Sequence, residues 1–338
     1  MALVTKAMKD TFHEMVLGDP MSPADAMLES INRLFKMALQ NRGKGSFREL
    51  LEFSARYRNM AVFNMMMAYA QRPGALMLME DYKWPFFGRQ VKPEARPVII
   101  LKNFGPVSLL YDIEDTYQFR RISPEMEEFL YRMEHPFAVE GDIDERKLKT
   151  LLKNLKYHGI AYDSTMTTGA GYGANLRLNT CYCPTLYFKT RDYDYSYESA
   201  FTINMKSSET DNNVIFASLA HELGHFFCKH LHKPLGWDCE EREPIGRSQA
   251  EFEAETTSYL VCQRAGIDNA HSADYLAGYM DDSGNIPDVN FGLIVNAVKR
   301  IEQTMNGITF EDGALWKYDM RFREMVKNAR RERHVSIR

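Results

Sequence analysis

The amino-acid sequence predicts an α+β protein with two domains: a mixed α/β domain at residues 1–135 and a second one at 136–338. Helical patterns at 23–41 and 46–71 precede short strand-like pieces, at 75–80, 97–102 and 107–111. Charge changes along the chain as well. Residues 31–102 contain thirteen Lys and Arg against five Asp and Glu, a net +8, whereas the whole chain carries −4. The remainder therefore carries −12, and the sequence predicts a basic first domain and an acidic second domain with a basic tail at 316–338.

The pentapeptide His-Glu-Leu-Gly-His at residues 221–225 carries the strongest chemical signal. Helix positions four apart share one face, so His221 and His225 can both direct a ring nitrogen at one zinc ion. Glu222 is placed to take a proton from a water whose pKa zinc lowers to about 7. The alternative is a chance match with two exposed histidines. It is disfavoured because the flanking residues are apolar, typical of a buried helix where unpaired polar groups are costly.

The ends of this helix and its later histidines are also predictable. Asp211–Asn213 offer an N-cap, and Pro234 and Gly236 are expected to end the helix. The metzincin spacing would require Gly at 228 and His at 231, but the chain has Cys228 and Leu231. His230 and His232 are expected at the exposed end of the same helix, where they cannot fold back onto the metal.

A third zinc ligand is predicted downstream, because a catalytic zinc needs three protein ligands and an open position. Glu251 and Glu255 are four residues apart and share a helical face, whereas Glu253 points elsewhere. Glu251 is the expected ligand, and Glu255 is expected to hydrogen-bond and orient a ligand histidine. The alternative is a capping box formed by Ser248 and Glu251. The ligand interpretation is favoured because Glu251 follows His225 by 26 residues.

Composition indicates an ordinary globular protein, with 45% hydrophobic and 26% charged residues among 338. No apolar run reaches membrane-spanning length and the first residues lack a secretory pattern, so we expect a cytoplasmic protein with no membrane partner. The cysteines are odd in number and irregularly spaced, which disfavours a disulfide framework; they are Cys181, Cys183, Cys228, Cys239 and Cys262.

Aromatic residues alternate with the basic residues of the first domain. Basic groups with stacking rings are what single-stranded DNA needs, since its bases are unpaired. The alternative is that Phe53, Phe63 and Tyr69 belong to the core and the lysines form a solvated face. On composition alone the two interpretations are equally supported. The aromatic residues are Phe47, Phe53, Tyr57, Phe63, Tyr69, Tyr82, Trp84, Phe86 and Phe87.

The remaining segments are predicted in outline. Residues 113–140 are acidic and typical of a connector, and residues 147–157 form a basic amphipathic helix. Residues 169–173 are predicted as a flexible Gly-rich turn. Residues 200–205 alternate as a strand does, and we expect this strand to border the cleft and pair with an extended peptide substrate. Residues 289–305 are predicted as a late helix.

Several motifs together resemble a known family. Arg56-Tyr-Arg-Asn59, Asn64, Gln71-Arg-Pro73, Trp84, Gly88–Lys92 and Arg96–Ile100 are similar to the N-terminal domain of ArdC-type antirestriction proteins. Residues 201–274 resemble the family's zincin domain, which is related to ImmA/IrrE metallopeptidases. The matching residues there are His221–His225, Glu251, Ala254-Glu255, Leu260-Val-Cys262 and Ala265-Gly-Ile267. The similarity covers about two thirds of the chain in the same order, and residues 113–200 and the tail lie outside it.

The resemblance implies an N-terminal domain that binds single-stranded DNA, followed by a zincin-like metallopeptidase domain. Zinc would be held by His221, His225 and Glu251, with Glu222 as the base. Tyr259, Tyr275 and Tyr279 are candidates, by residue type only, for the donor that stabilises the oxyanion. The implied DNA-binding residues are Arg56, Arg58, Asn59, Trp84, Arg89 and Lys92.

Three functions follow as hypotheses. The first is a protein that binds single-stranded DNA and carries a zinc-metallopeptidase domain, protecting mobile-element DNA against restriction. The second is an ImmA/IrrE-like regulatory protease that cleaves a repressor, and the third is a non-enzymatic single-stranded-DNA-binding protein with a structural zinc site. The complete His-Glu-Leu-Gly-His motif with Glu251 argues against the third, and the +8 segment argues against a protease alone. The sequence therefore favours an enzyme that also binds DNA and acts on a protein substrate.

Overall fold

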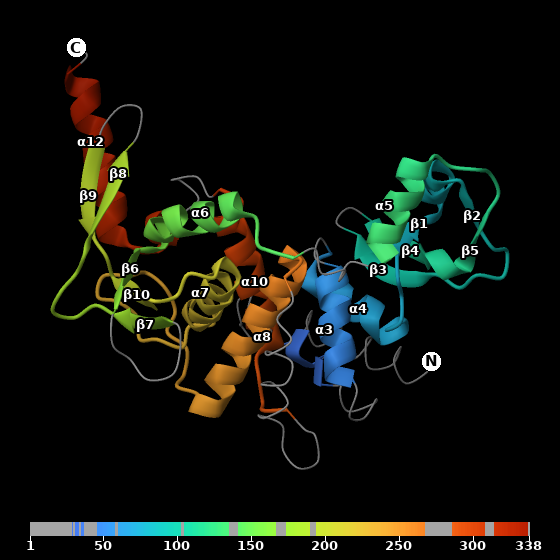
Figure 1. Ribbon diagram of the computed structural model, residues 1–338, viewed down its shortest axis with the longest axis horizontal. Helices are drawn as coiled ribbons and strands as arrows, with labels where there is room; N and C mark the ends of the chain where they lie inside the picture. The colour runs from blue at the N-terminus through green and yellow to red at the C-terminus, as the bar shows by residue number, and fades with distance from the viewer. Residues whose placement is uncertain are drawn as a thin grey trace. The chain divides into compact units, whose positions relative to one another are not determined.

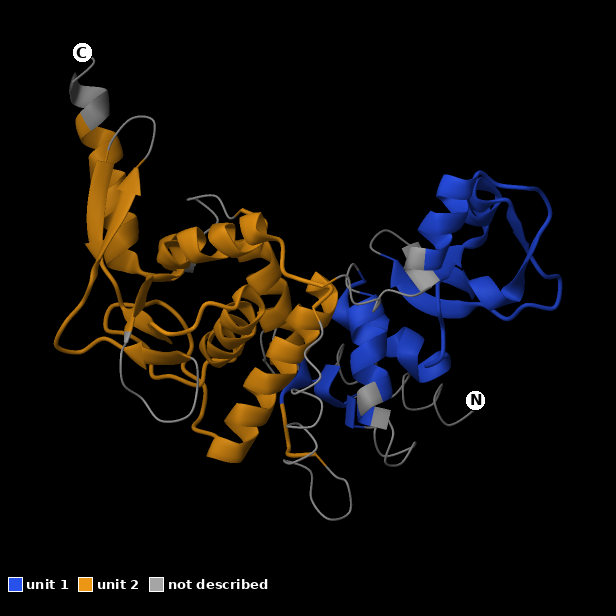
Figure 2. Ribbon diagram, in the orientation of Figure 1, with its two compact units in different colours: residues 1–140, 282–285, 290–292 blue, residues 141–281, 286–289, 293–338 orange. Residues whose placement is uncertain are grey.

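The computed structural model describes residues 29, 31–33, 35–36, 46–57, 60–102, 105–134, 141–166, 174–189, 194–267, 286–307 and 314–336. The chain divides into two compact units (Figure 2). Unit 1 comprises residues 1–140, 282–285 and 290–292, and unit 2 comprises residues 141–281, 286–289 and 293–338. Both units combine helices with β-sheet (Figure 1), so the predicted α+β class is confirmed. None of the helices in these described ranges is both long and apolar enough to cross a membrane.

Residues 46–71 of unit 1 contain two helices where the sequence predicted one. Helix α3 spans Ser46–Arg56 and helix α4 spans Val62–Gln71. Between them the N-cap residue Ala61 has φ −57° and ψ 139°, an extended conformation that a helix cannot continue through. The predicted single helix over 46–71 is therefore wrong at its centre, although both of its ends are correct to within a residue.

An antiparallel sheet follows, with strand order β1-β4-β3. Strand β1 spans Leu78–Glu80, β3 spans Val98–Lys102 and β4 spans Gly105–Asp112, close to the predicted strand-like pieces. Edge strand β3 is covered by amide side chains of α4. Gln71 donates to Ile99 O (2.7 Å) and accepts from Ile99 N (2.9 Å), and Asn64 does the same at Leu101 (2.9 and 3.0 Å).

The predicted connector at 113–140 is wrong over its described part, because residues 113–134 complete the packing of unit 1. Strand β2 (Arg89–Val91) pairs with β5 (Thr116–Gln118), and helix α5 (Pro124–Glu134) follows. Leu130 of α5 joins Met77, Trp84 and Ile113 in a buried cluster. Trp84 belongs to the 3₁₀ helix η1 (Asp81–Phe87). The segment contributes few apolar residues to this core among many acidic ones, so its composition predicted a connector.

The sheet of unit 2 has the strand order β6-β10-β7. Strand β10 (Phe201–Lys206) pairs in parallel with β6 (Ile160–Met166) and antiparallel with β7 (Ala174–Leu178). The predicted strand at 200–205 therefore exists, but both of its edges are occupied. The expectation that it pairs with a substrate is wrong, since an added strand needs an open edge. The Gly-rich turn at 169–173 lies outside the described residues.

Helix α7 (Asn212–Phe227) and the 3₁₀ helix η3 (Leu155–His158) contact this sheet, and further helices complete unit 2. Helix α6 spans Glu145–Asn154, in the region predicted as helical, and η3 follows it. Helices α7 and α8 (Arg247–Ala265) pack against each other, and α10 spans Phe291–Met305, near the predicted 289–305.

The predicted basic tail is helical in the structure. Helix α11 spans Ala314–Tyr318 and helix α12 spans Met320–Ser336. Strands β8 (Thr185–Lys189) and β9 (Asp194–Glu198) form a hairpin beside α12 (Figure 1). Phe322 packs against rings of both strands, Phe188 at 5.1 Å and Tyr197 at 5.2 Å between ring centroids. The tail is therefore part of the fold of unit 2.

Candidate metal centre

Helix α7 places the two histidines of the pentapeptide on one face. Asp211 is its N-cap, as predicted, and its carboxylate accepts a hydrogen bond from Asn213 N at 2.8 Å. The helix ends at Phe227, several residues before the predicted stop at Pro234 and Gly236. The physical reason is the backbone at Lys229, whose φ of +60° reverses the chain.

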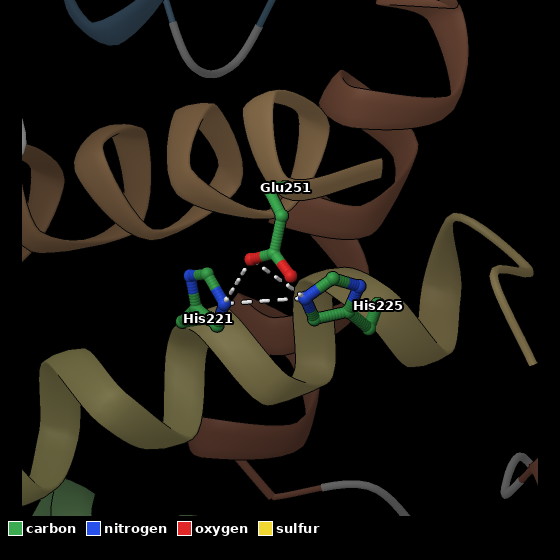
Figure 3. Close-up of side chains that lie close together, drawn as sticks. All are labelled: His221, His225 and Glu251. Atoms are coloured by element: carbon green, nitrogen blue, oxygen red, sulfur yellow. Dashed lines mark hydrogen bonds and ion pairs between the residues drawn. The ribbon is translucent and has the colours of Figure 1, made fainter. Parts of the chain in front are cut away.

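His221, His225 and Glu251 converge at one point (Figure 3). The two Nε2 atoms of His221 and His225 lie 3.2 Å apart. Glu251 Oε2, from α8, lies 3.5 Å from His221 Nε2 and 3.7 Å from His225 Nε2. The structure therefore brings together all three residues that the sequence predicted as ligands.

The start of α8 leaves Glu251 available for this cluster. The helix is capped at Gly246 without any side-chain hydrogen bond, and Ser248 lies inside the first turn. The capping-box alternative for Ser248 and Glu251 is therefore not formed. The largely exposed Arg247 also approaches Glu251, with its Nε 3.7 Å from Glu251 Oε1.

The far nitrogen of each histidine is also bonded. Glu255 Oε2 accepts from His221 Nδ1 at 2.9 Å, which is the contact predicted for Glu255. His225 Nδ1 lies 2.9 Å from Nδ1 of His230. A neutral histidine that donates from Nδ1 keeps a lone pair on Nε2, the atom that faces the cluster.

Whether these residues fit a metal ion depends on which of the three facing atoms can accept a hydrogen bond. His221 Nε2, His225 Nε2 and Glu251 Oε2 are all hydrogen-bond acceptors when both rings are neutral. Three acceptors within 3.2–3.7 Å repel one another unless a cation lies among them. Two imidazole nitrogens and one carboxylate oxygen are a donor set that zinc accepts, and the residues therefore fit a divalent ion.

Electrostatics favour positive charge at the same point. Burial lowers the pKa of His221, but hydrogen bonds to Glu251 and Glu255, with the charge of Glu222, raise it to about 9. Hydrogen bonds from His221 and His225 hold the pKa of the Glu251 carboxyl far below its usual range. The cluster thus stabilises either a bound proton or a bound metal cation.

Glu222 lies on the same helix with its carboxylate directed at the sheet. Its Oε2 accepts a hydrogen bond from Leu176 N of strand β7 at 2.8 Å. Strand β7 is an edge strand of the described sheet, because it pairs only with β10. The predicted base is therefore held beside an open strand edge.

Three residues are linked by hydrogen bonds beside the cluster, and the sequence did not predict these contacts: His230, Glu253 and Arg242. The side chain of His230 is only 4% exposed and that of Glu253 is fully buried, whereas His232 is 85% exposed. His232 is exposed as expected, although α7 ends before it at Phe227; the expectation for His230 is wrong because the turn at Lys229 folds it back. Arg242 lies in the segment between α7 and α8, so neither helical period nor motif spacing predicts its contact with Glu253.

A second group of possible ligands is present but is already occupied. Cys228, His230 and Glu253 have ligand atoms within 4.8 Å of one another. Arg242, however, donates to both oxygens of Glu253, at 2.6 and 2.9 Å. Burial raises the pKa of the Cys228 thiol well above its usual range and lowers that of His230. A protonated thiol and a paired carboxylate make this group a poor metal site.

The candidate oxyanion donors receive no support from their positions. Tyr259 is buried within α8, at 7% exposure. Tyr275 and Tyr279 lie outside the described residues.

The predicted DNA-binding residues of unit 1 have mostly structural contacts. Trp84 is fully buried, so its ring cannot stack on a base, and the expectation for Trp84 is wrong. Arg56 donates to Ala75 O at 2.8 Å, Arg89 to Thr116 Oγ1 at 2.6 Å and Lys92 to Glu114 O at 2.8 Å. Arg58 and Asn59 lie outside the described residues.

Other aromatic rings of unit 1 are exposed. Phe86 of η1 is 71% exposed and Tyr82 is 61% exposed. Tyr117 and Phe119, at the β5 strand, are 43% and 49% exposed. Basic groups accompany two of these rings: Lys83 lies 5.6 Å from the Tyr82 centroid, and the guanidinium of Arg120 lies 5.8 Å from that of Phe119.

Comparison with known proteins found no matching family model and no matching curated protein. Two solved structures are similar to this chain. One is the metal-free crystal structure of the antirestriction protein ArdC from the R388 plasmid, at 12% identity and TM-score 0.32, covering 73% of this chain and 85% of that one. The other is its Mn(II)-bound crystal structure, at 16% identity and TM-score 0.29, covering 72% and 80%.

Proposed function

We propose that this chain is a zinc-dependent metallopeptidase whose basic N-terminal domain binds single-stranded DNA. The observation that carries the enzymatic part is the convergence of His221, His225 and Glu251, with Glu222 on the same helix. The role in protecting mobile-element DNA against restriction is proposed from the ArdC-type motifs in the sequence. We also propose that residues 136–338 form a zincin-like metallopeptidase domain.

The chemistry requires a base, a nucleophile and stabilisation of negative charge. Zinc held by His221, His225 and Glu251 would act as a Lewis acid and make a water acidic enough to attack a peptide carbonyl near neutral pH. Glu222 takes the proton from the attacking water and passes it to the leaving amine. Glu255 accepts from His221 Nδ1 and thereby keeps the Nε2 lone pair of that ring directed at the cluster.

Strand β7 is the proposed binding surface for substrate. Leu176 N donates to Glu222, so the backbone edge of β7 that faces away from β10 meets the base. An extended peptide that pairs with this edge would have its backbone carbonyl groups beside Glu222. This arrangement supports a peptide rather than a small polar metabolite as the substrate.

The DNA-binding part rests on charge and on exposed rings. The +8 segment supplies the attraction to phosphate groups, which is independent of base sequence. Stacking is assigned to Phe86 and Phe119 in place of Trp84, because both rings are exposed and Phe119 has Arg120 as a basic neighbour. Lys83 accompanies a third exposed ring, that of Tyr82.

The second candidate is an ImmA/IrrE-like regulatory protease with the same catalytic residues. It is favoured by one observation: the side chains of Arg56, Arg89 and Lys92 all donate hydrogen bonds within unit 1. In that case the basic segment is mainly a structural and solvated surface. A non-enzymatic protein with a structural zinc is the third candidate, and it predicts zinc binding without hydrolysis.

The decisive experiment combines metal analysis with peptide cleavage by the full chain. Wild type should bind one zinc per chain and cleave unfolded protein substrates, and Glu222→Gln should keep zinc and fold while losing cleavage. Glu243→Gln, at an exposed carboxylate between α7 and α8, is the matched control and should cleave as wild type does. Zinc binding with no cleavage in wild type would favour the structural-zinc candidate, and loss of zinc in Glu222→Gln would overturn the role of Glu222.

A further inference from the structure

The chain reverses direction directly after helix α7. Cys228 caps the helix, and Lys229 adopts a left-handed conformation with φ +60°. His230 N then bonds back to His225 O at 3.0 Å. This turn brings the His230 ring into edge contact with the His225 ring, with centroids 5.0 Å apart.

A continuous series of hydrogen bonds leads away from His225. Its Nδ1 lies 2.9 Å from Nδ1 of His230, and His230 Nε2 lies 2.9 Å from Glu253 Oε2. Arg242 donates to both carboxylate oxygens of Glu253, at 2.6 and 2.9 Å. Arg242 also donates to Cys228 O at 3.0 Å, which ties the series to the end of α7.

The pair of Arg242 and Glu253, at the end of this series, fixes which group donates in each hydrogen bond. Arg242 can only donate, so the Glu253 carboxylate accepts, and it accepts from His230 Nε2–H as well. A neutral His230 with its proton on Nε2 has a lone pair on Nδ1, and it therefore accepts from His225 Nδ1–H. A neutral His225, the form that binds a metal, then has its lone pair on Nε2, directed at His221 and Glu251.

We propose that His230, Glu253 and Arg242 are positioning residues that fix the ring and tautomer of His225 for metal binding. The inference rests on the proposed metal centre and assigns to His225 the orienting support that Glu255 gives to His221. A metal-ligating histidine commonly donates its other ring nitrogen to a carboxylate or carbonyl. Here a second histidine, His230, stands between the ligand His225 and the carboxylate of Glu253.

The experiment measures the zinc dissociation constant of the full chain by competition with a chelator. His230→Ala should weaken zinc binding by about 10- to 100-fold, because partners of ligand residues typically contribute that much. His230→Gln should restore most of the affinity, since its amide offers an acceptor and a donor in place of the two ring nitrogens. His232→Ala, an exposed histidine bonded to Glu241, is the matched control and should bind zinc as wild type does.

The outcomes separate this inference from the proposed function. If wild type binds zinc and His230→Ala binds it within twofold of wild type, the inference is overturned while the metal centre stands. If His230→Gln is as weak as His230→Ala with equal melting temperature without metal, hydrogen bonding is not the cause and the inference is again overturned. A wild type that binds no zinc overturns both.

A measurement on wild type covers the case in which His230→Ala does not fold. Long-range ¹⁵N–¹H spectra of the zinc-loaded protein should show His225 protonated at Nδ1, with this proton protected from solvent exchange and close to the His230 ring. A His225 Nδ1 proton that exchanges at the rate of an exposed histidine would overturn the proposal.

Discussion

Gly224 of α7 lies directly against Ala254 of α8. A Cβ atom built on Gly224 would come 2.9 Å from Ala254 Cα and 3.0 Å from Ala254 O, with Thr257 Cβ at 3.2 Å. Ala254 Cα and Ala254 O are backbone atoms, so they cannot move aside without a shift of α8. Only glycine permits the approach that holds Glu251 within 3.7 Å of both histidines.

Gly224→Ala should therefore damage stability and metal binding together. We expect a loss of about 1–3 kcal/mol in unfolding free energy, the usual cost of inserting a methyl group into a packed contact. Zinc affinity should fall as well, because the two ligand-bearing helices move apart. Denaturant unfolding and chelator competition measure both effects. Gly74→Ala is the control, since a Cβ there meets no atom within 4 Å; equal behaviour of the two variants would contradict the argument.

Replacing Glu251 should act mainly on metal binding, and replacing its neighbour Glu253 should act mainly on stability. Glu251→Ala should abolish tight zinc binding and cost little stability, because it removes a ligand that is partly exposed. Glu253→Ala should cost about 3–5 kcal/mol, because it leaves Arg242 without its buried partner. Zinc titration and urea unfolding of the two variants are the measurements. A Glu251→Ala chain that retains zinc, beside a stable Glu253→Ala chain, would reverse the assignment.

The stability of the metal-free protein should depend on pH through His221. Its pKa is raised to about 9 in the folded state, against about 6.5 in the unfolded chain. A raised pKa contributes stability that is complete below pH 6.5 and is lost as the pH rises through 9. Melting temperatures in chelator should therefore fall over this window. The decline should be absent from His221→Gln, and a wild-type melting temperature that rises over the window would contradict the prediction.

Single-stranded DNA binding should depend on the exposed rings of unit 1. Phe86→Ala and Phe119→Ala should each weaken binding by about 1–3 kcal/mol, the contribution of one stacked base. The salt dependence should stay unchanged, because no charge is removed. Fluorescence anisotropy with an oligonucleotide measures both quantities. Tyr182→Ala, with a 72% exposed ring in unit 2, is the control; equal losses in all three variants would argue against a specific stacking surface.

The sequence predicted the features that depend on the periodicity of a single helix or strand. The 3.6-residue period placed His221 and His225 on one face of α7, and the spacing on α8 placed Glu251 and Glu255 towards them. These contacts depend on helix geometry alone. The α+β class followed in the same way from short strand-like pieces after helical ones.

Features set by tertiary contacts were not predictable in this way. His230 was expected on an exposed helix end, but one left-handed residue, Lys229, turns it into the interior. Trp84 matched a nucleic-acid-binding composition but fills the core with Leu130, from a segment that looked like a connector. No periodic pattern in the sequence predicts either outcome, because each depends on contacts between segments that are separate in the chain.

The amide side chains that cover strand β3 have a consequence for self-association. Along Ile99 and Leu101, Gln71 and Asn64 each supply one donor and one acceptor, the same set that a neighbouring strand offers. An open edge with these apolar residues would be a template for pairing with a second copy of the chain. Gln71 and Asn64 therefore take the place of a neighbouring strand, and they leave fewer backbone groups of Ile99 and Leu101 free to pair with a second copy of the chain.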